Sequence, residues 1–319
     1  MISTGRFTHQ LRKLTHYSFD HCSHCGKELI KNVPALAGYT NDDLEIYVGE
    51  CCRSQISELA SHIYWWWESY KRPTPNTFLW RYMDFSKFVA LLNSRAIFFS
   101  KAKLLGDPFE GARGFAHRQA EWKQYCLEYY RNTIKTIPGQ TEPPTEEYLK
   151  QESERLYYQV EASGEREVEN TFVSCWHANV VESEALWRLY APPATNGVAI
   201  CMEFQALDDA LDSNFDIKFG YIQYINFENR FAGTYDRIFW KRASLSHESE
   251  VRGVIYSGRN EPIASDGLLV PFDISTGIKT VVTSPFAPIW FNDVVKATTE
   301  QFGFELPVRS SELLLRPFF

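Results

Sequence analysis

A short proline-containing segment divides this 319-residue chain into two parts of different character. The segment Lys71-Arg72-Pro73-Thr74-Pro75-Asn76 holds two helix-breaking residues and predicts a linker. Four of the seven cysteines precede it, whereas most of the apolar and aromatic runs that can build a large core follow it. The sequence therefore predicts a small N-terminal module over residues 1–72 and a larger domain over residues 77–319.

Composition narrows the class of protein. Aromatic residues make up 15% of the chain, which excludes a largely disordered protein and provides enough apolar surface for an enzyme-sized core. The net charge of −7 argues against broad, non-specific binding of nucleic acid. No run approaches the roughly 20 apolar residues that span a bilayer, and no secretory signal is recognisable before Leu14. We expect a cytoplasmic protein with no membrane partner.

The N-terminal cysteines have the spacing of a metal site. Cys22 and Cys25 form a C-x-x-C-G knuckle, in which the turn directs both sulfurs toward one ion. Cys51 and Cys52 follow a predicted strand over residues 44–48 and form the second half-site. Knuckle, hairpin and a cysteine at a helix start resemble a treble-clef or zinc-ribbon finger over about residues 16–60. The resemblance implies a structural zinc ion held by these four cysteines.

Two features of this module have other interpretations. Vicinal cysteines rarely bind one ion together, so a histidine is an alternative fourth ligand; the histidines within reach in sequence are His16, His21, His24 and His62. The four thiols could also be buried free cysteines. After them, apolar residues at helical spacing predict a helix over residues 53–70, whose Trp65-Trp66-Trp67 run either packs against neighbouring modules or stacks on nucleic-acid bases.

The second part alternates predicted strands and helices without a repeat. Asp84 is the expected N-cap of a helix over residues 85–94. Two long helices, over residues 113–136 and 145–160, look like an insertion at about residues 113–165. Further helices are predicted over residues 183–190 and 292–301. Strands are predicted over residues 77–82, 96–100, 171–176, 197–204, 219–226, 268–270 and 279–283. This order predicts an α+β fold with a mixed or antiparallel sheet and inserted helices.

Several motifs in this part occur in the order of a known bacterial family. They are Leu79-Trp80-Arg81-Tyr82, Ile97-Phe98-Phe99-Ser100, Gly106-Asp107-Pro108-Phe109-Glu110, Phe172-Val173-Ser174-Cys175-Trp176, Leu186-Trp187-Arg188-Leu189-Tyr190, Gly197–Phe204, Glu248-Ser249-Glu250-Val251-Arg252 and Thr280–Ala287. Residues 78–315 thereby resemble domain of unknown function 2971.

The layout of these motifs is also similar to that of the ADP-ribosyltransferase superfamily. The resemblance implies that Arg81 anchors NAD, that Tyr82 and Tyr190 stack on it, and that Glu248 and Glu250 supply the catalytic carboxylates. Glu250 would act on the sugar and Glu248 on the acceptor, with both side chains on one face of a strand. The implied NAD-binding residues are Arg81, Tyr82, Ser100, Asp107, Glu110, Trp187 and Tyr190, and the implied catalytic residues are Glu250, Glu248 and Arg81.

Each of these residues also has a purely structural interpretation. Arg81 could pair with Asp107 or Glu110, and Glu248 and Glu250 could form a solvated strand face with Arg252 as their partner. Asp107 could belong to a capped turn. Trp187 and Tyr190, at i and i+3, equally suit core packing, and His177 and His247 suit satisfied polar sites.

The function expected from the resemblance is an NAD-dependent ADP-ribosyltransferase or NAD glycohydrolase, such as a toxin or phage-defence effector acting on a macromolecule. One alternative is a metal-dependent nucleic-acid-processing protein in which Glu110, Glu248 and Glu250 hold a divalent ion. Another is a non-catalytic module that binds a ligand in the same cleft. The Rossmann and P-loop phosphate-binding motifs are absent from the sequence.

Overall fold

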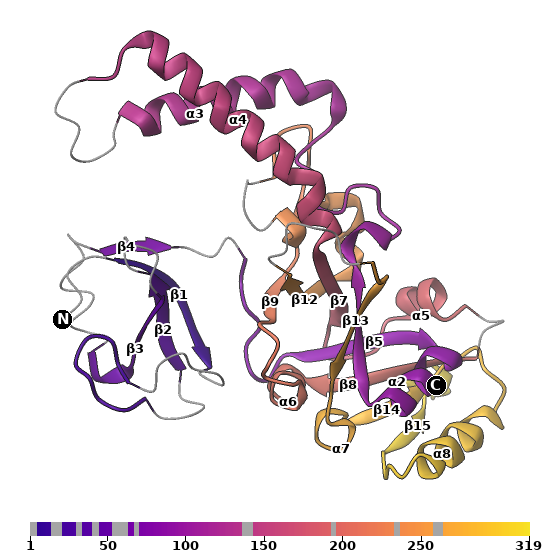
Figure 1. Cartoon of the computed structure of the whole chain (residues 1–319). Coiled ribbons are helices and arrows are strands. Elements are labelled where there is room, and N and C mark those ends of the chain that lie inside the picture. The colour runs from indigo at the N-terminus through magenta and orange to yellow at the C-terminus, as the bar shows by residue number, and fades with distance from the viewer. Residues whose placement is uncertain are drawn as a thin grey trace. The chain divides into compact units, whose positions relative to one another are not determined.

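The computed structural model describes residues 5–13, 21–29, 34–39, 45–52, 63–66, 70–135, 143–192, 196–232, 237–257 and 264–319. The chain divides into two compact units, residues 1–71 and 72–319. Figure 1 colours the chain by residue number, from indigo at the N-terminus to yellow at the C-terminus. Among the helices described, none is both long and apolar enough to cross a membrane.

The first unit is built on a four-stranded sheet with the order β3-β2-β1-β4. Its strands are β1 (Gly5–Lys13), β2 (Pro34–Tyr39), β3 (Glu45–Val48) and β4 (Ile63–Trp66). Strand β3 lies where the sequence predicted one, and the short helix η1 (Glu50–Cys52) follows it.

The predicted helix over residues 53–70 is wrong in the part that the structure describes. Ile63–Trp66 form strand β4, which pairs in parallel with β1. Its residues are β-branched or aromatic, and such side chains favour a strand when a partner strand is available. Trp67 and residues 53–62 lie outside the described residues.

The second unit contains a nine-stranded sheet with one parallel strand pair, so the expected α+β fold with a mixed sheet is confirmed. Its path is β13-β6-β7-β5-β8-β14-β15, and β12 joins β7 to β9. The strands are β5 (Phe78–Asp84), β6 (Ala96–Lys101), β7 (Thr171–Ala178), β8 (Gly197–Glu203), β9 (Lys218–Tyr221), β12 (Glu250–Tyr256), β13 (Gly267–Pro271), β14 (Thr280–Thr283) and β15 (Val308–Ser310). A separate parallel pair joins β10 (Gln223–Ile225) to β11 (Trp240–Arg242).

The helices lie largely where the sequence predicted them. Helix α2 begins after Asp84, whose carboxylate accepts the N–H of Lys87, and its residues Phe88, Leu91 and Leu92 are buried. The insertion forms the antiparallel hairpin of α3 and α4 at one end of the sheet (Figure 1). The helices are α2 (Phe85–Ser94), α3 (Gln119–Lys135), α4 (Glu146–Glu169), α5 (Glu184–Tyr190), α6 (Phe204–Ala210), α7 (Ile274–Gly277) and α8 (Phe291–Gln301).

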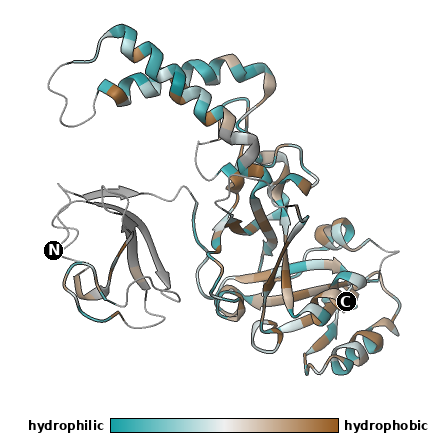
Figure 2. Cartoon of the chain, viewed as in Figure 1, coloured by the Kyte–Doolittle hydropathy of each residue, from teal (hydrophilic) through white to brown (hydrophobic). Residues whose placement is uncertain are grey.

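Strand β7 has two different neighbours along one edge, β6 and β5. The place where these two strands diverge, at residues 174–176 of β7, is called the fork. Phe172 and Val173 of β7 pair with β6, whereas His177 and Ala178 pair with β5. Between these contacts, residues 174–176 pair with neither strand, while β12 pairs along the whole opposite edge. Figure 2 shows that hydrophobic residues dominate the central strands around the fork, in contrast to the more hydrophilic α3–α4 hairpin.

Candidate active site and candidate metal centre

Three glutamates from distant parts of the chain surround one lysine. The Nζ atom of Lys241, on β11, lies 2.7 Å from Glu250 Oε2, 2.8 Å from Glu248 Oε2 and 3.4 Å from Glu110 Oε1. All four residues are buried. A buried ammonium stabilises carboxylates far more strongly than an exposed one, because little water screens the interaction. The cluster therefore depends on Lys241 at its centre.

Arg252, on β12, binds two of these three carboxylates and has no exposed surface. Its Nε donates to Glu250 Oε1 at 2.7 Å, and its Nη1 and Nη2 donate to the two oxygens of Glu110 at 2.7 and 3.1 Å. Nη1 also donates to the backbone carbonyl of Ile238. By formal charge, three carboxylates and two cations leave this buried group with one net negative charge.

The two cations keep Glu250 ionised. Burial alone raises the pKa of Glu250, but attraction to Arg252 and Lys241 outweighs burial and lowers the pKa to about 2. For Lys241 the directions are opposite: burial lowers its pKa, and the surrounding carboxylates, Glu250 foremost, raise the pKa by more than burial lowers it. Both charges therefore persist through the neutral pH range.

Glu248 and Glu250 meet at a turn rather than along a strand. Glu248 ends the short helix η6 (Ala243–Glu248), Ser249 has a left-handed backbone with φ 41°, and Glu250 begins β12. The expected Glu-x-Glu strand face is therefore wrong, because Ser249 breaks the strand alternation. The solvated alternative is wrong as well, because both glutamates are buried.

Two tyrosines complete the cluster. The hydroxyl of Tyr190, at the end of α5, donates to Glu248 Oε1 at 3.2 Å. The backbone N–H of Glu250 donates to the Tyr224 hydroxyl at 2.8 Å. Tyr190 is 47% exposed, so it connects the buried charges to solvent.

Arg81 occupies the fork between β5 and β6. Its Nη1 donates to Ser174 Oγ at 3.0 Å, and its Nη2 donates to the Phe98 carbonyl at 3.0 Å. Among the described residues, no carboxylate forms an ion pair with it, so the expected bridges to Asp107 and Glu110 are wrong. Asp107 binds Arg242 instead, at 2.7 Å. Desolvation by burial lowers the pKa of Arg81, as expected for a guanidinium without an anionic partner.

The guanidinium and the acidic cluster leave the sheet on opposite faces. Trp80 pairs with His177, and His177 pairs with Glu250, so these side chains share one face. Arg81 follows Trp80 and therefore leaves β5 on the other face. Cys175 of β7 pairs with Arg252 of β12 and therefore lies on the face of the acidic cluster.

The other residues expected to contact a cofactor have mixed environments. Trp187 is fully buried and donates to Glu182, and its ring packs edge-on against Tyr82, with centroids 4.9 Å apart. The hydroxyl of Tyr82 accepts the N–H of Ser183. These two rings belong to the core, and their burial does not favour the expected contact with a cofactor. Ser100 is half-buried on β6, and its hydroxyl donates to the Lys101 carbonyl.

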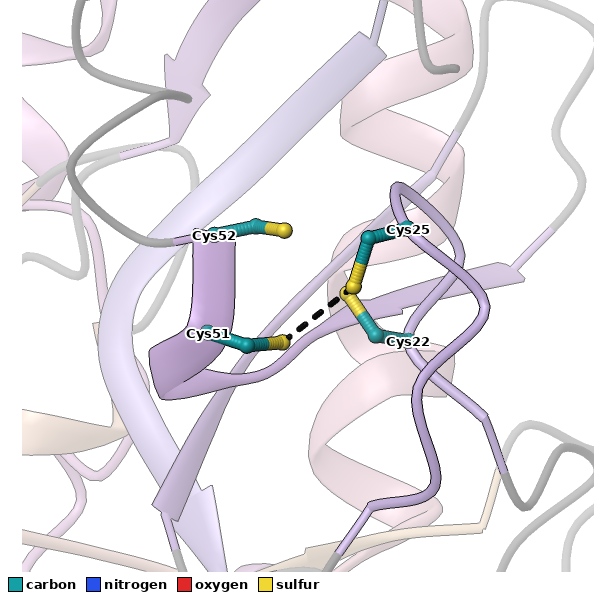
Figure 3. A group of neighbouring side chains, drawn as sticks. All are labelled: Cys22, Cys25, Cys51 and Cys52. Atoms are coloured by element: carbon teal, nitrogen blue, oxygen red, sulfur yellow. Dashed lines mark hydrogen bonds between the residues drawn. The ribbon is translucent and has the colours of Figure 1, made fainter.

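The four N-terminal cysteines come together in the first unit. Figure 3 shows Cys22 and Cys25 on the knuckle facing Cys51 and Cys52 on η1. All four Sγ atoms lie within 4.8 Å of one another, and the Cys25 and Cys51 sulfurs are 3.5 Å apart. Four thiolates around zinc, at about 2.3 Å from the ion, have sulfur separations of about 3.8 Å. The cluster fits a tetrahedral zinc ion without help from a histidine.

The local backbone explains how the knuckle and the vicinal pair meet. Gly26 has φ +74°, and its N–H donates to the Cys22 carbonyl, which closes the knuckle turn. A Cβ on Gly49 would lie 2.9 Å from a Leu29 methyl and 3.4 Å from Cys51 Sγ, so a glycine leaves room for the sulfur. His21 and His24 do not belong to the cluster, and His16 and His62 lie outside the described residues.

Sequence reasoning did not identify Lys241 as a functional residue and assigned Arg252 only to a solvated strand. A signal was present, since Arg252 stands within the apolar run Val251–Ile255. A charge in such a run indicates a buried partner, because an unpaired buried charge is costly. Neither sequence nor spacing identified Glu110 as that partner.

Comparison with known proteins gives little guidance. No protein-family model matches the chain, and no curated protein matches it. The resemblance to domain of unknown function 2971 therefore gains no support and stays a prediction. Among solved structures, Thermus sp. 2.9 DarT in complex with ADP-ribosylated ssDNA aligns over 77% of this chain and 100% of that chain, with 11% identity and a TM-score of 0.34. A TM-score this low does not establish a shared fold.

Proposed function

We propose that residues 72–319 bind NAD and break the bond between nicotinamide and ribose, with transfer of ADP-ribose to water or to a macromolecular acceptor. The observation that carries this proposal is the buried cluster around Lys241, which has one net negative formal charge and lies beside the half-exposed Tyr190. A fixed negative site of this kind stabilises a cation, and NAD carries a cationic nicotinamide ring.

Cleavage of the bond between nicotinamide and ribose depends more on stabilising the positive charge of the ribose than on proton transfer. As the C1′–N bond breaks, its electron pair moves to the nicotinamide nitrogen, and positive charge develops on the ribose. A carboxylate held in a site of low dielectric stabilises that charge. A bond then forms between C1′ and the oxygen or nitrogen of the acceptor, which loses its proton to a carboxylate or to solvent.

The contacts of the two carboxylates favour Glu248 over Glu250 as the one that meets the sugar. This order reverses the one implied by the superfamily resemblance. Both oxygens of Glu250 are bound, one by Arg252 and one by Lys241. One oxygen of Glu248 contacts Lys241, and the other accepts the hydroxyl of the half-exposed Tyr190. A ligand that displaces the Tyr190 hydroxyl gains direct access to Glu248.

Arg81 is the proposed anchor for the diphosphate of NAD. Its guanidinium is desolvated and lacks a carboxylate partner among the described residues, so an anionic ligand would offset the cost of its burial. To reach both this guanidinium and the acidic cluster, the dinucleotide would have to pass residues 174–176, where Ser174 and Trp176 are buried. Tyr190 remains the proposed stacking residue, because its ring is exposed.

The cluster is less suited to the alternative of a divalent metal ion. Each of its carboxylates already binds Lys241 or Arg252, and these cations occupy the space between the oxygens. Within the described part of the chain, the four cysteines are the group with metal-ligand spacing.

The direct test is incubation of the purified full-length protein with NAD alone and with cell extract as a source of acceptors. We expect release of free nicotinamide, measured by chromatography, without any need for Mg²⁺ or Mn²⁺. Consumption of nucleic acid that depends on a divalent ion, with NAD left intact, would favour the metal-dependent alternative. Binding of NAD without nicotinamide release would leave the non-catalytic module.

For the first unit we propose a structural zinc ion bound by Cys22, Cys25, Cys51 and Cys52. Four cysteine ligands leave no open position for a substrate, so the ion would stabilise the fold. Its proposed role in the whole protein is to hold a module that contacts the macromolecular acceptor.

We expect about one zinc ion per chain in protein purified without chelator, as measured by elemental analysis. Cys51→Ser and Cys52→Ser should each lose most of this zinc, because a serine hydroxyl is a poor ligand for it. Cys126→Ser is the matched control: Cys126 is a buried cysteine of α3 outside the cluster, and its replacement should leave the zinc content unchanged. Full retention of zinc in Cys51→Ser would show that the vicinal pair does not bind the ion together.

A further inference from the structure

Glu182 is a buried carboxylate that joins helix α5 to the segment after β15. Its side chain is 3% exposed. Its Oε2 accepts the indole N–H of Trp187 at 2.7 Å and the hydroxyl of Ser311 at 2.6 Å. Its Oε1 accepts the backbone N–H of Glu312 at 2.6 Å. Hydrogen bonds to an ionised carboxylate are stronger than bonds between neutral groups, so Glu182 holds Trp187 and Ser311 firmly together.

Hydrogen bonds stabilise Glu182 more than its cationic neighbour does. Arg309 Nη1 lies 3.8 Å from Glu182 Oε1, and the Arg309 side chain is 37% exposed, so water screens this pair. A buried carboxylate is costly unless hydrogen-bond donors satisfy it. The three donors therefore keep the charge of Glu182 in place, and the loss of one of them weakens the connection between α5 and residues 311–312.

Helix α5 depends on such contacts for its position. It has seven residues, and helices this short are marginal in water without packing contacts. Ser183 caps the helix, and its backbone N–H donates to the Tyr82 hydroxyl at 2.7 Å. The bond to Tyr82 at the start of α5 and the bond from Trp187 to Glu182 in its middle therefore fix where the helix lies.

Tyr190 ends the helix three residues after Trp187. Residues three apart lie on the same side of a helix, so a shift of Trp187 also shifts Tyr190. The Tyr190 hydroxyl donates to Glu248 Oε1 at 3.2 Å, and the half-exposed Tyr190 ring is the proposed stacking residue for NAD. Glu182 is thereby connected to the acidic cluster through α5.

We propose that Glu182 is a positioning residue for the NAD site: with Ser311 it holds α5 so that the Tyr190 ring already lies beside Glu248 when the dinucleotide binds. This inference rests on the proposed function and adds the segment after β15 to the groups that determine NAD affinity. A stacking ring that is held in place loses little conformational freedom on binding, so this preorganisation lowers the KM. The charge that stabilises the ribose cation is unaffected, so kcat should depend little on Glu182.

The experiment measures KM and kcat for nicotinamide release from NAD in full-length variants. Glutamine has a single acceptor oxygen, so in Glu182→Gln the amide nitrogen must face at least one of the three donors. We expect the KM for NAD to rise about 10-fold in this variant, with kcat almost unchanged. Ser311→Ala removes one donor and leaves the carboxylate charged, so it should raise the KM by a smaller factor. It provides the same test if Glu182→Gln does not fold.

Glu184→Gln is the matched control. Glu184 lies on the same helix, but it forms an exposed pair with Arg188, so its replacement should leave the KM at the wild-type value.

A double-mutant cycle distinguishes positioning from a general effect on the fold. In a Tyr190→Ala background there is no ring to position, so adding Glu182→Gln should leave the KM of that variant unchanged. The same increase in both backgrounds would overturn the inference, as would an unchanged KM in Glu182→Gln alone, and both results leave the proposed function intact. A wild-type protein that releases no nicotinamide would reject the proposed function and the inference with it.

Discussion

An Arg252→Met variant is expected to lose about 3–5 kcal/mol of unfolding free energy, measured by chemical denaturation of the full-length protein. Arg252 has no exposed surface and binds both Glu110 and Glu250. Methionine fills a similar volume but leaves two buried carboxylates with only Lys241 between them. Breaking one side of a buried ion network costs far more than removing an exposed pair, because the remaining charges stay desolvated.

The matched control is Arg155→Met on α4, where the arginine forms an exposed pair with Glu152. Its loss should leave the unfolding free energy almost unchanged, because water screens an exposed pair. Acidification gives a second readout. The folded pKa of Glu250, about 2, lies below the ordinary value of 4.5, so its stabilising contribution is present above pH 4.5 and is lost as the pH falls toward 2. The Arg252→Met variant should show a weaker loss over this window. Equal stability of Arg252→Met and Arg155→Met would contradict the description of the cluster.

The second large effect is expected from Glu248→Gln. Glutamine keeps the shape of the side chain and can still contact Tyr190, but it removes the negative charge proposed to stabilise the ribose cation. Removal of one such electrostatic contact lowers turnover by about 100- to 1,000-fold. We therefore expect nicotinamide release from NAD to fall by that factor, with little change in the KM for NAD.

Glu300→Gln on α8 is the control for this prediction, because Glu300 is exposed and far from the cluster in sequence. It should release nicotinamide at the wild-type rate. Circular dichroism of Glu248→Gln should match that of the wild type, which would exclude unfolding as the cause of lost activity. Undiminished turnover in a folded Glu248→Gln would remove Glu248 from the catalytic role and return the assignment to Glu250.

Local signals in the sequence were sufficient for most elements of the second unit. Helix α2 was predictable because Asp84 caps it and because Phe88, Leu91 and Leu92 fall on one helical face. The short apolar run over residues 96–100 also predicted a strand, and it forms β6. The same kind of signal failed for β4, since strand formation there depends on pairing with β1, about 60 positions earlier in the chain.

The candidate site could be predicted only in part, because its geometry depends on contacts between distant residues. Glu248 and Glu250 were identifiable, but their convergence depends on the left-handed Ser249 and on Lys241. Glu110 and Arg252 are separated by 142 positions, and spacing says nothing about such a pair. The fork that holds Arg81 arises because β5 and β6 share one edge of β7, a property of the sheet topology.

The most direct test of the central claim is a crystal structure of Glu248→Gln with NAD, since this variant should bind the dinucleotide without consuming it. The claim is that one dinucleotide spans the fork between Arg81 and the cluster around Lys241. We predict the diphosphate within hydrogen-bonding distance of the Arg81 guanidinium and the nicotinamide-bearing ribose beside residue 248. A dinucleotide bound elsewhere, with Arg81 still bonded only to Ser174 and the Phe98 carbonyl, would contradict the account.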